Sequence, residues 1–379
     1  MAIKIDLKNL GYMKSKIFAY LTLFMTLFIV ISCDDDDSKP EAAATFDVSK
    51  TTVSIGEEIQ FTNTSKNATA FKWSFGDGTT SKEVSPKKSY TSSGTFVVSL
   101  LSTGTGGSQI ANVSVTVLPD PEIFFTEVNA NMIRKFAIGS PTSIGDFLDV
   151  TEMAGVGLAY DAANEKVYFS DYAVTGEGKI WRVNLDGTDL EAIVDGLYDP
   201  YQIALDVENG KVYWAEDLDA DEIGHIGRAN LDGSDKEYVV SLDGGEFRAI
   251  ALDTENDKMY YYEVYNEDLY QANLDGTDAT PILSGVFGYA LAVDMVNDKI
   301  YFDEQNDEEL KRADLDGSNI ETIDDNGSRI YGIAVDAANN KIYWSGRDSG
   351  VITTAALDGT HKRDLASGLF SPRGLFLKK

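Results

Sequence analysis

Three kinds of residue are scarce in this 379-residue chain: cysteine, histidine and the basic residues. A single cysteine cannot form an intrachain disulfide. Two histidines, His225 and His361, are too few for a histidine-rich metal site, and we expect both at the surface. Because 62 acidic residues outnumber 32 basic ones, the formal charge is −30. That balance argues against nucleic-acid binding and against direct electrostatic attraction to anionic lipid, and it indicates a well-solvated surface.

Long apolar runs are scarce too, and the one that exists covers residues 17–31. Its length is short for a membrane span, and Lys14 and Lys16 precede it. The run leads into Ser32-Cys33. A basic segment, a short apolar segment and then cysteine resemble the signal peptide of a bacterial lipoprotein. The resemblance implies cleavage after residues 1–32 and a lipid on Cys33, with Met13 as an alternative start to Met1.

Such a lipid would anchor the chain to the membrane of the cell envelope, since each buried methylene contributes about 0.8 kcal/mol. We expect an outer-membrane, surface-exposed protein. Residues 33–42 form an acidic tether that begins with Asp34 to Asp37. An early acidic run resembles a surface-export signal in some lipoproteins, and a plain solvated tether is the alternative.

Residues 43–119 alternate apolar and polar side chains, as in Val113, Val115 and Val117. Period two with Gly, Ser and Thr between the runs predicts an antiparallel β-sandwich with one buried face per sheet. The motif Trp-Ser-Phe-Gly-Asp-Gly, which starts at Trp73, is followed by Tyr-Thr-Ser-Ser-Gly-Thr-Phe, which starts at Tyr90. Both resemble the PKD domain. The resemblance implies an immunoglobulin-like sandwich that serves as a spacer or adhesion module, with sugar binding by exposed aromatics as the alternative.

A different organisation governs residues 120–379, where one pattern recurs at intervals of 41 to 46 residues. The tripeptide Leu-Asp-Gly begins at Leu185, Leu231, Leu274, Leu315 and Leu357. Aromatic pairs stand at Phe124-Phe125, Tyr168-Phe169, Tyr213-Trp214, Tyr260-Tyr261, Tyr301-Phe302 and Tyr343-Trp344. A period of 40 to 45 residues that holds several short strands predicts a propeller or solenoid, in which each unit must stack on its neighbours to bury its apolar faces.

The aromatic pairs begin tetrapeptides such as Tyr-Phe-Ser-Asp171 and Tyr-Trp-Ala-Glu216. These resemble the low-density-lipoprotein receptor class B repeat, named for Tyr-Trp-Thr-Asp, and the resemblance implies a six-bladed β-propeller. The first blade lacks an innermost strand, and residues 374–377 read as such a strand at the chain's end. We therefore expect the C-terminal strand to close the ring. The recurring tetrapeptide acids and the recurring Arg182, Arg228 and Arg312 are predicted to link neighbouring blades.

Function should lie where the repeats differ. The residue five before each strand-ending Asp opens an innermost strand and should rim the central channel. These residues are Val156, Tyr201, Arg248, Tyr289 and Tyr331, and Arg373 stands at the equivalent place in the last strand. We place Tyr198, Phe247, Phe287 and Phe370 just outside. Tyrosine has a flat apolar face with a polar tip, and arginine grips carboxylates. Together they suit a glycan with acidic groups or a carboxylate-bearing peptide. The alternative is that the tyrosines plug the channel; Arg248 and Arg373 favour binding.

One loop carries Asp217, Asp219 and Asp221, spaced as in a calcium loop. Glu222 at the sixth position and Arg228 at the twelfth exclude the helix-loop-helix type, which leaves a looser calcium site or a solvated loop. The sequence shows no nucleophile–base pair, and no cofactor is expected. We predict an all-β protein that binds an extracellular glycan or protein ligand. The rivals are a calcium-dependent propeller hydrolase or lyase of the lactonase type and a purely structural envelope protein.

Overall fold

The computed structural model describes residues 39–151, 153, 155–172, 176–325 and 327–379. The expected signal peptide, the lipidated Cys33 and the acidic run after it lie outside the described residues. Within the described ranges, no helix has the length and apolar character needed to cross a membrane. The described chain is built from β-strands, as predicted, with two single-turn 3₁₀ helices at Val128–Ala130 and Ala337–Asn339.

The first part of the chain forms two sheets. One sheet has the order β1 (Phe46–Val48), β3 (Ile59–Asn63), β6 (Lys87–Lys88). The other has the order β2 (Thr52–Ser54), β8 (Gly107–Leu118), β7 (Gly94–Gly104), β4 (Ala70–Ser74), β5 (Thr80–Ser81). Trp73 on β4 is fully buried, and its ring lies 4.9 Å from the Phe46 ring and 5.6 Å from the Phe61 ring, on strands of the other sheet. Its indole nitrogen donates to the Glu83 carbonyl at 3.0 Å, so the buried polar tip is satisfied.

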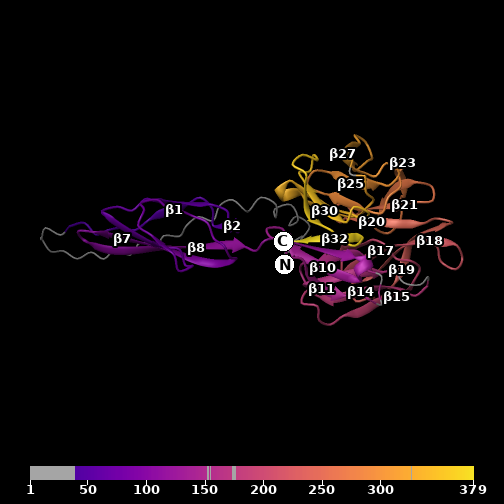
Figure 1. Ribbon diagram of the computed structural model, residues 1–379, viewed down its shortest axis with the longest axis horizontal. Helices are drawn as coiled ribbons and strands as arrows, with labels where there is room; N and C mark the ends of the chain where they lie inside the picture. Colours follow the sequence, from indigo (N-terminus) through magenta and orange to yellow (C-terminus); the bar gives the residue numbers. More distant parts are fainter. Residues whose placement is uncertain (1–38, 152, 154, 173–175, 326) are drawn as a thin grey trace, which may run out of the picture. The chain divides into compact units, whose positions relative to one another are not determined.

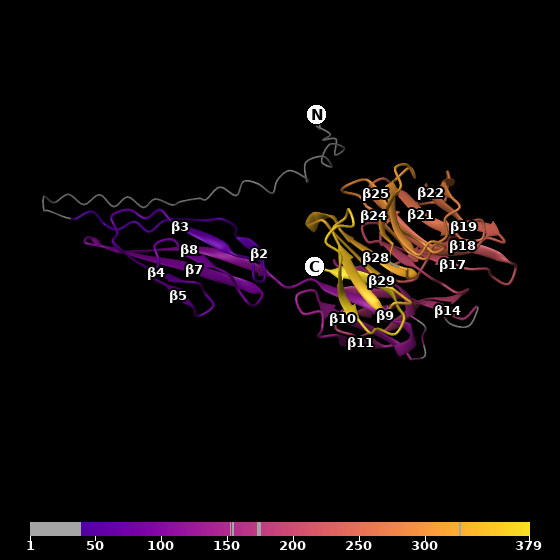
Figure 2. The same cartoon turned by 45° about the horizontal axis from the view of Figure 1, so that its top comes forward.

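The second part carries six four-stranded sheets among its described residues (Figures 1 and 2). From the innermost strand outward, they are β32 (Pro372–Lys378), β9 (Glu122–Glu127), β10 (Met132–Ala137), β11 (Gly145–Asp149); β12 (Gly155–Asp161), β13 (Lys166–Asp171), β14 (Gly178–Asn184), β15 (Glu191–Leu197); β16 (Ile203–Asp206), β17 (Lys211–Glu216), β18 (Ile223–Asn230), β19 (Glu237–Asp243); β20 (Phe247–Asp253), β21 (Lys258–Glu263), β22 (Asp268–Asn273), β23 (Thr280–Ser284); β24 (Leu291–Asp294), β25 (Lys299–Glu304), β26 (Glu309–Asp314), β27 (Glu321–Asp325); and β28 (Ile330–Asp336), β29 (Lys341–Gly346), β30 (Val351–Ala355), β31 (Arg363–Ser367). Consecutive innermost strands contact one another around a closed ring.

The repeated aromatic pairs explain why the sheets stack. Neighbouring residues of a strand point to opposite faces of the sheet. Tyr213 therefore packs into the cluster that contains Tyr261 of the following sheet, whereas Trp214 packs into the cluster that contains Tyr168 of the preceding sheet. Both side chains are at most 2 % exposed. Each pair thus supplies one large apolar anchor to each face, and every such strand is buried on both sides.

The ring is closed by the end of the chain, as predicted. Strand β32 pairs antiparallel with β9, with Phe376 opposite Phe124. The Phe376 ring stacks on Phe124 at 4.8 Å and on Tyr160 of the next sheet at 5.2 Å. The first and last segments of the propeller therefore share one sheet and one stacked aromatic column.

The Asp-Gly turns connect the two outer strands of a sheet and approach the preceding sheet. Asp275 Oδ1 accepts hydrogen bonds from the backbone N–H of Thr277 at 3.0 Å and from its hydroxyl at 2.6 Å. Gly276 has φ +84°, and a Cβ there would lie 1.9 Å from the carbonyl oxygen of Val239 in the preceding sheet. Only glycine fits both the left-handed conformation and this approach.

The recurring arginines link neighbouring sheets, as predicted. Each donates from Nη1 to a leucine carbonyl of the next sheet: Arg182 to Leu231 at 2.7 Å, Arg228 to Leu274 at 3.0 Å and Arg312 to Leu357 at 2.6 Å. The tetrapeptide acids make a different contact. Glu216 accepts from Trp214 Nε1 of its own strand at 2.9 Å and from the N–H of Tyr198 at 2.8 Å, which lies in the segment that connects β15 of the preceding sheet to β16. Glu127 likewise accepts from the N–H of Phe370, between β31 and β32. These two acids therefore hold the segment that joins two sheets rather than a strand of the neighbouring sheet.

Candidate functional site

Five of the predicted rim side chains form one continuous contact group. The Tyr289 ring lies 5.9 Å from Tyr201 and stacks on Tyr331 at 4.5 Å. The Arg248 guanidinium lies 4.4 Å from the centre of the Tyr201 ring, and the Arg373 guanidinium lies 5.0 Å from that of Tyr331. We call these five residues the rim. Tyr201 and Tyr331 are less than 10 % exposed, so the three tyrosines pack against one another and fill much of the rim end of the channel.

The rim backbone is fixed from beneath by the third residue of the tetrapeptides. Ser345 Oγ donates to the Arg373 carbonyl at 2.6 Å, and Ser170 Oγ donates to the Tyr201 carbonyl of the next sheet. Gln202 then spans the inside of the ring. Its amide nitrogen donates to the Leu291 carbonyl at 3.0 Å, and its amide oxygen accepts from the Ile250 N–H at 3.2 Å. A ligand at this end would therefore meet a floor that is already hydrogen-bonded.

Arg248 is held by acids of the fold. Its Nη2 lies 2.6 Å from Asp217 Oδ2 and 2.7 Å from Glu246 Oε2, and its Nη1 donates to the Tyr201 hydroxyl. Burial raises the pKa of Asp217 to about 7, although the positive charge of Arg248 opposes that shift. The charge of Arg248 is thus largely compensated inside the protein.

Arg373 is the opposite case. In the described part of the chain, its guanidinium makes no hydrogen bond or ion pair, and its buried Nε atom has no partner. Burial lowers the pKa of Arg373, and the nearby charge of Arg347 lowers it further. The Arg347 guanidinium lies 5.4 Å from the centre of the same Tyr331 ring and 3.5 Å from Asp348. Two arginines therefore lie at the Tyr331 ring, and Asp348, the acid that Arg347 contacts, is also paired with Arg329.

Sequence reasoning missed Arg347 and Tyr172. Arg347 follows Gly346, the one tetrapeptide end where the recurring acid is absent, and that departure could have pointed to it. Tyr172 follows the tetrapeptide of the second sheet, and its ring lies 5.1 Å from Tyr201. Both lie in loops between the second and third strands, where repeat counting assigns no position.

The four outer candidates do not behave alike. Phe247 is 1 % exposed and packs edge-on against Tyr261 in the core, so it offers no surface to a ligand. Phe287 is half-buried with its ring 5.4 Å from Tyr289. Tyr198 is also half-buried, whereas Phe370 is 63 % exposed. Only the last three remain as outer contacts.

The three aspartates of the acidic loop have separate partners. Asp217 binds Arg248, and Asp219 Oδ1 accepts the N–H groups of Asp221 at 2.8 Å and Ile223 at 3.0 Å. Asp221 itself is exposed. Among the residues that the structure describes, no three His, Cys, Asp or Glu side chains gather in a group that could hold a metal.

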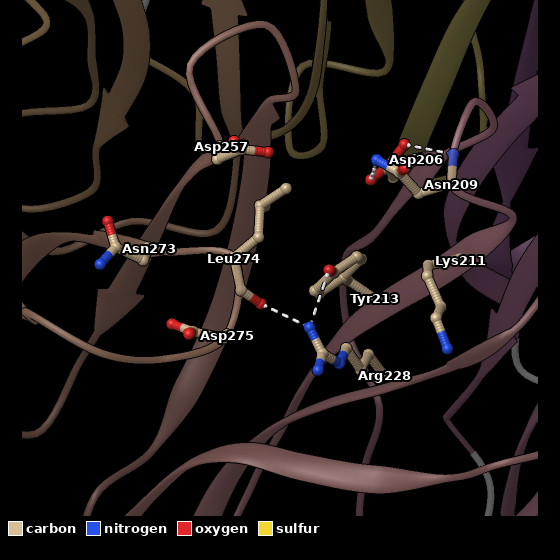
Figure 3. Close-up of a pocket in the computed structure, with 9 residues that line it drawn as sticks. All are labelled: Asp206, Asn209, Lys211, Tyr213, Arg228, Asp257, Asn273, Leu274 and Asp275. Atoms are coloured by element: carbon tan, nitrogen blue, oxygen red, sulfur yellow. Dashed lines mark hydrogen bonds between the residues drawn. The ribbon is translucent and has the colours of Figure 1, made fainter. Parts of the chain in front are cut away.

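The opposite end of the propeller has grooves between sheets, of which Figure 3 shows one of ≈ 440 Å³. There Arg228 points between the Tyr213 hydroxyl and the Leu274 carbonyl, and Lys211 donates to Asn230 at 2.6 Å. Equivalent grooves lie at the Asp-Gly turns of other sheets. Because these grooves recur at the Asp-Gly turns, and two of them contain the structural arginines Arg228 and Arg312, we assign them to the packing of the sheets.

Comparisons with known proteins support both halves of the fold. Residues 37–117 match the PKD domain family, so the N-terminal sandwich is a PKD domain. No curated protein matches the chain.

Solved structures resemble the chain at low sequence identity. One chain of a nidogen/laminin complex covers 68 % of this chain and 98 % of its own length, with TM-score 0.59 and 16 % identity. A putative TolB from Agrobacterium tumefaciens covers 68 % and 97 %, with TM-score 0.53 and 12 % identity. A protein of unknown function from Bacteroides thetaiotaomicron covers 88 % of both chains, with TM-score 0.51 and 13 % identity. These likenesses bear on the fold alone, and they confirm a β-propeller.

Proposed function

We propose that this chain is a lipid-anchored envelope protein whose propeller rim binds a ligand with carboxylate groups, either an acidic glycan or an acidic peptide. The PKD domain serves as the spacer, and Cys33 carries the anchor. The anchor rests on the sequence pattern of residues 14–33. The ligand proposal rests on one observation above all: within the described residues Arg373 has no acid partner, whereas Arg248 and Arg347 each contact at least one acid.

The buried Nε of Arg373 has lost water without gaining a hydrogen-bond acceptor, which is costly to the fold. This chain has an excess of acids, yet none within the described residues pairs with Arg373. A ligand carboxylate placed against Arg373 and Arg347 would accept the hydrogen bonds that Arg373 lacks within the protein. Because both guanidiniums lie at the Tyr331 ring, they would also fix the orientation of that carboxylate. The flat faces of Tyr289 and Tyr331 would then border the rest of the ligand.

The two predicted arginines, Arg248 and Arg373, are therefore expected to contribute differently to ligand binding. Arg248 already holds Asp217 and Glu246, so a ligand anion gains little there. The anion-binding part of the rim is the Arg373 side, with Arg347 as its second member.

The test uses the full chain and two carboxylate probes, oligogalacturonate and a polyglutamate peptide, with a neutral oligosaccharide as the reference. We expect one acidic probe to bind and the Arg347→Ala, Arg373→Ala double variant to lose at least about tenfold in affinity, as is usual when a charged contact is removed. Arg363→Ala is the matched control, because Arg363 is exposed on the outer strand β31. Binding that is equal in wild type and double variant, or absent for both acidic probes, would overturn the proposal.

A further inference from the structure

A second group of reactive side chains lies on the outer strands of the third sheet and on the loop between β17 and β18. Strands β18 and β19 form the outer half of that sheet (Figure 1). His225 on β18 lies directly opposite Ser241 on β19, and its Nδ1 is 2.8 Å from Ser241 Oγ. Its Nε2 is 3.1 Å from Asp219 Oδ2. Sequence analysis found no nucleophile–base pair and expected His225 at the surface, whereas its side chain is 5 % exposed.

The imidazole plane is fixed by packing. Between the pairs Ile226–Val240 and Gly227–Tyr238 the register shifts, so that Val239 is an extra residue in β19. This β-bulge puts Tyr238 on the same face as Ser241, although the two are three residues apart. The Tyr238 ring consequently stacks on His225 at 3.8 Å with an interplanar angle of 8°. The ring of His225 cannot turn without losing that stack.

Asp219 is oriented by its own loop, which connects β17 to β18. Its Oδ1 accepts two backbone N–H groups, and its own N–H donates to the Ile223 carbonyl at 2.9 Å. The hydrogen bond from Ile223 is the main reason that the pKa of Asp219 lies below its usual range. An ionised Oδ2 opposite Nε2 favours the imidazole tautomer with its hydrogen on Nε2. Nδ1 is then free to accept the hydroxyl hydrogen of Ser241.

This is the order of roles that activates a serine, namely a nucleophile, a base and an acid that orients the base. The base is buried, whereas Ser241 is exposed on the outermost strand of its sheet, where a substrate can reach it. On such an edge every second backbone N–H points away from the neighbouring strand. These groups are the donors that a developing oxyanion would use.

We propose that Asp219, His225 and Ser241 form a catalytic triad for acyl transfer from small activated esters. Ser241 Oγ attacks the ester carbonyl carbon, and its proton passes to His225 Nδ1. The carbon–oxygen bond to the leaving group then breaks, and the leaving oxygen takes the proton from Nδ1. Water attacks the acyl-serine in the same way, so that acid is released and the Ser241 hydroxyl is restored. Asp219 stays ionised throughout and orients the imidazole.

The test treats the full chain with a fluorophosphonate probe and with p-nitrophenyl acetate. We expect one phosphonyl adduct per chain, located at Ser241 by mass spectrometry. Ser241→Ala should abolish the adduct, and both Ser241→Ala and His225→Gln should lower ester turnover at least about 100-fold, the usual contribution of a general base. Ser241→Ala leaves Nδ1 of the buried His225 without its partner, so its melting temperature should fall moderately while the variant stays folded at the assay temperature.

The chain supplies its own control in the Thr360 hydroxyl, which lies 3.0 Å from Nδ1 of the exposed His361. Thr360→Ala should leave the adduct and the turnover unchanged. The proposal fails if wild type reacts no faster than Ser241→Ala, or if the adduct maps to another residue. Neither result would bear on ligand binding at the rim.

Discussion

The two ends of the propeller are made by the same six sheets, but their charged side chains are satisfied in different ways. At the Asp-Gly end, Arg182, Arg228 and Arg312 repeat one contact with the next sheet. At the rim end, Arg248 and Arg373 occupy the same repeat position, yet Arg248 has two acids and Arg373 has none among the described residues.

The arginines at the Asp-Gly end hold the sheets together, whereas the arginines at the rim end differ from sheet to sheet and are candidates for ligand binding. Each sheet packs on the next in the same way, so a contact that stabilises every interface comes from a residue that recurs in the repeat. An arginine without an acid partner, found at one position only, does not stabilise these interfaces. The rim should therefore tolerate changes that the Asp-Gly end and the closing strand do not.

The largest effect is expected where the ring closes. Deletion of residues 374–379 removes most of β32, including the buried Leu375 and Phe376. Loss of one large core side chain costs about 2–5 kcal/mol, and here the first sheet also loses its innermost strand. We expect a loss of more than about 5 kcal/mol and a broadened transition in calorimetry. Lys379→Ala, which removes only an ion pair with Asp336, is the control. A truncated chain that melts as sharply and at the same temperature would disprove closure by this strand.

An effect of intermediate size is expected from Asp303, a fully buried acid at the rim end. Its Oδ1 accepts the N–H groups of Tyr289 at 2.8 Å and Ala290 at 2.7 Å. Burial raises its pKa from 3.8 to about 7, so between these values the folded chain holds a proton that the unfolded chain releases. Stability should therefore fall as pH rises through that window, by up to about 1.4 kcal/mol per pH unit.

Asp303→Asn should remove this part of the pH dependence, because an amide does not titrate. Urea unfolding at pH 5 and pH 8 measures it, and the loss between the two should be smaller in the variant by about 2 kcal/mol. Asp307→Asn, at an exposed carboxylate nearby, is the control. Equal losses in wild type and Asp303→Asn would show that Asp303 is ionised across the whole range.

The repeat made most of the fold predictable. The aromatic pairs, the Asp-Gly turns and the closing strand depend on local patterns, and the structure has all three. Phe247 shows the limit of that approach, because neighbouring residues of a strand face opposite ways. Arg248 points to the rim, so Phe247 turns into the core.

Other features depend on geometry that spacing does not contain. His225 meets Ser241 only because a β-bulge sets the register of β18 and β19. Arg347 reaches the Tyr331 ring from a loop, and loop conformation is not given by the repeat. The ion-pair partners of the rim arginines could not be predicted from the sequence either. Sequence placed Arg248 and Arg373 at equivalent positions, and only the structure distinguishes them.

The smallest effect tests the comparison of the two ends most directly, by truncating one arginine at each. Arg228→Ala removes the bond to the Leu274 carbonyl and the pair with Glu237 at 2.7 Å, and should lower the free energy of unfolding by about 1–2 kcal/mol, since part of that pair is exposed. Arg373→Ala removes a charge that the described residues leave without a partner, so urea unfolding should change by less than about 0.5 kcal/mol or in the stabilising direction. Equal losses would mean that both ends hold the ring together. Unequal losses in this direction would leave Arg373 with no structural role and ligand binding as its remaining one.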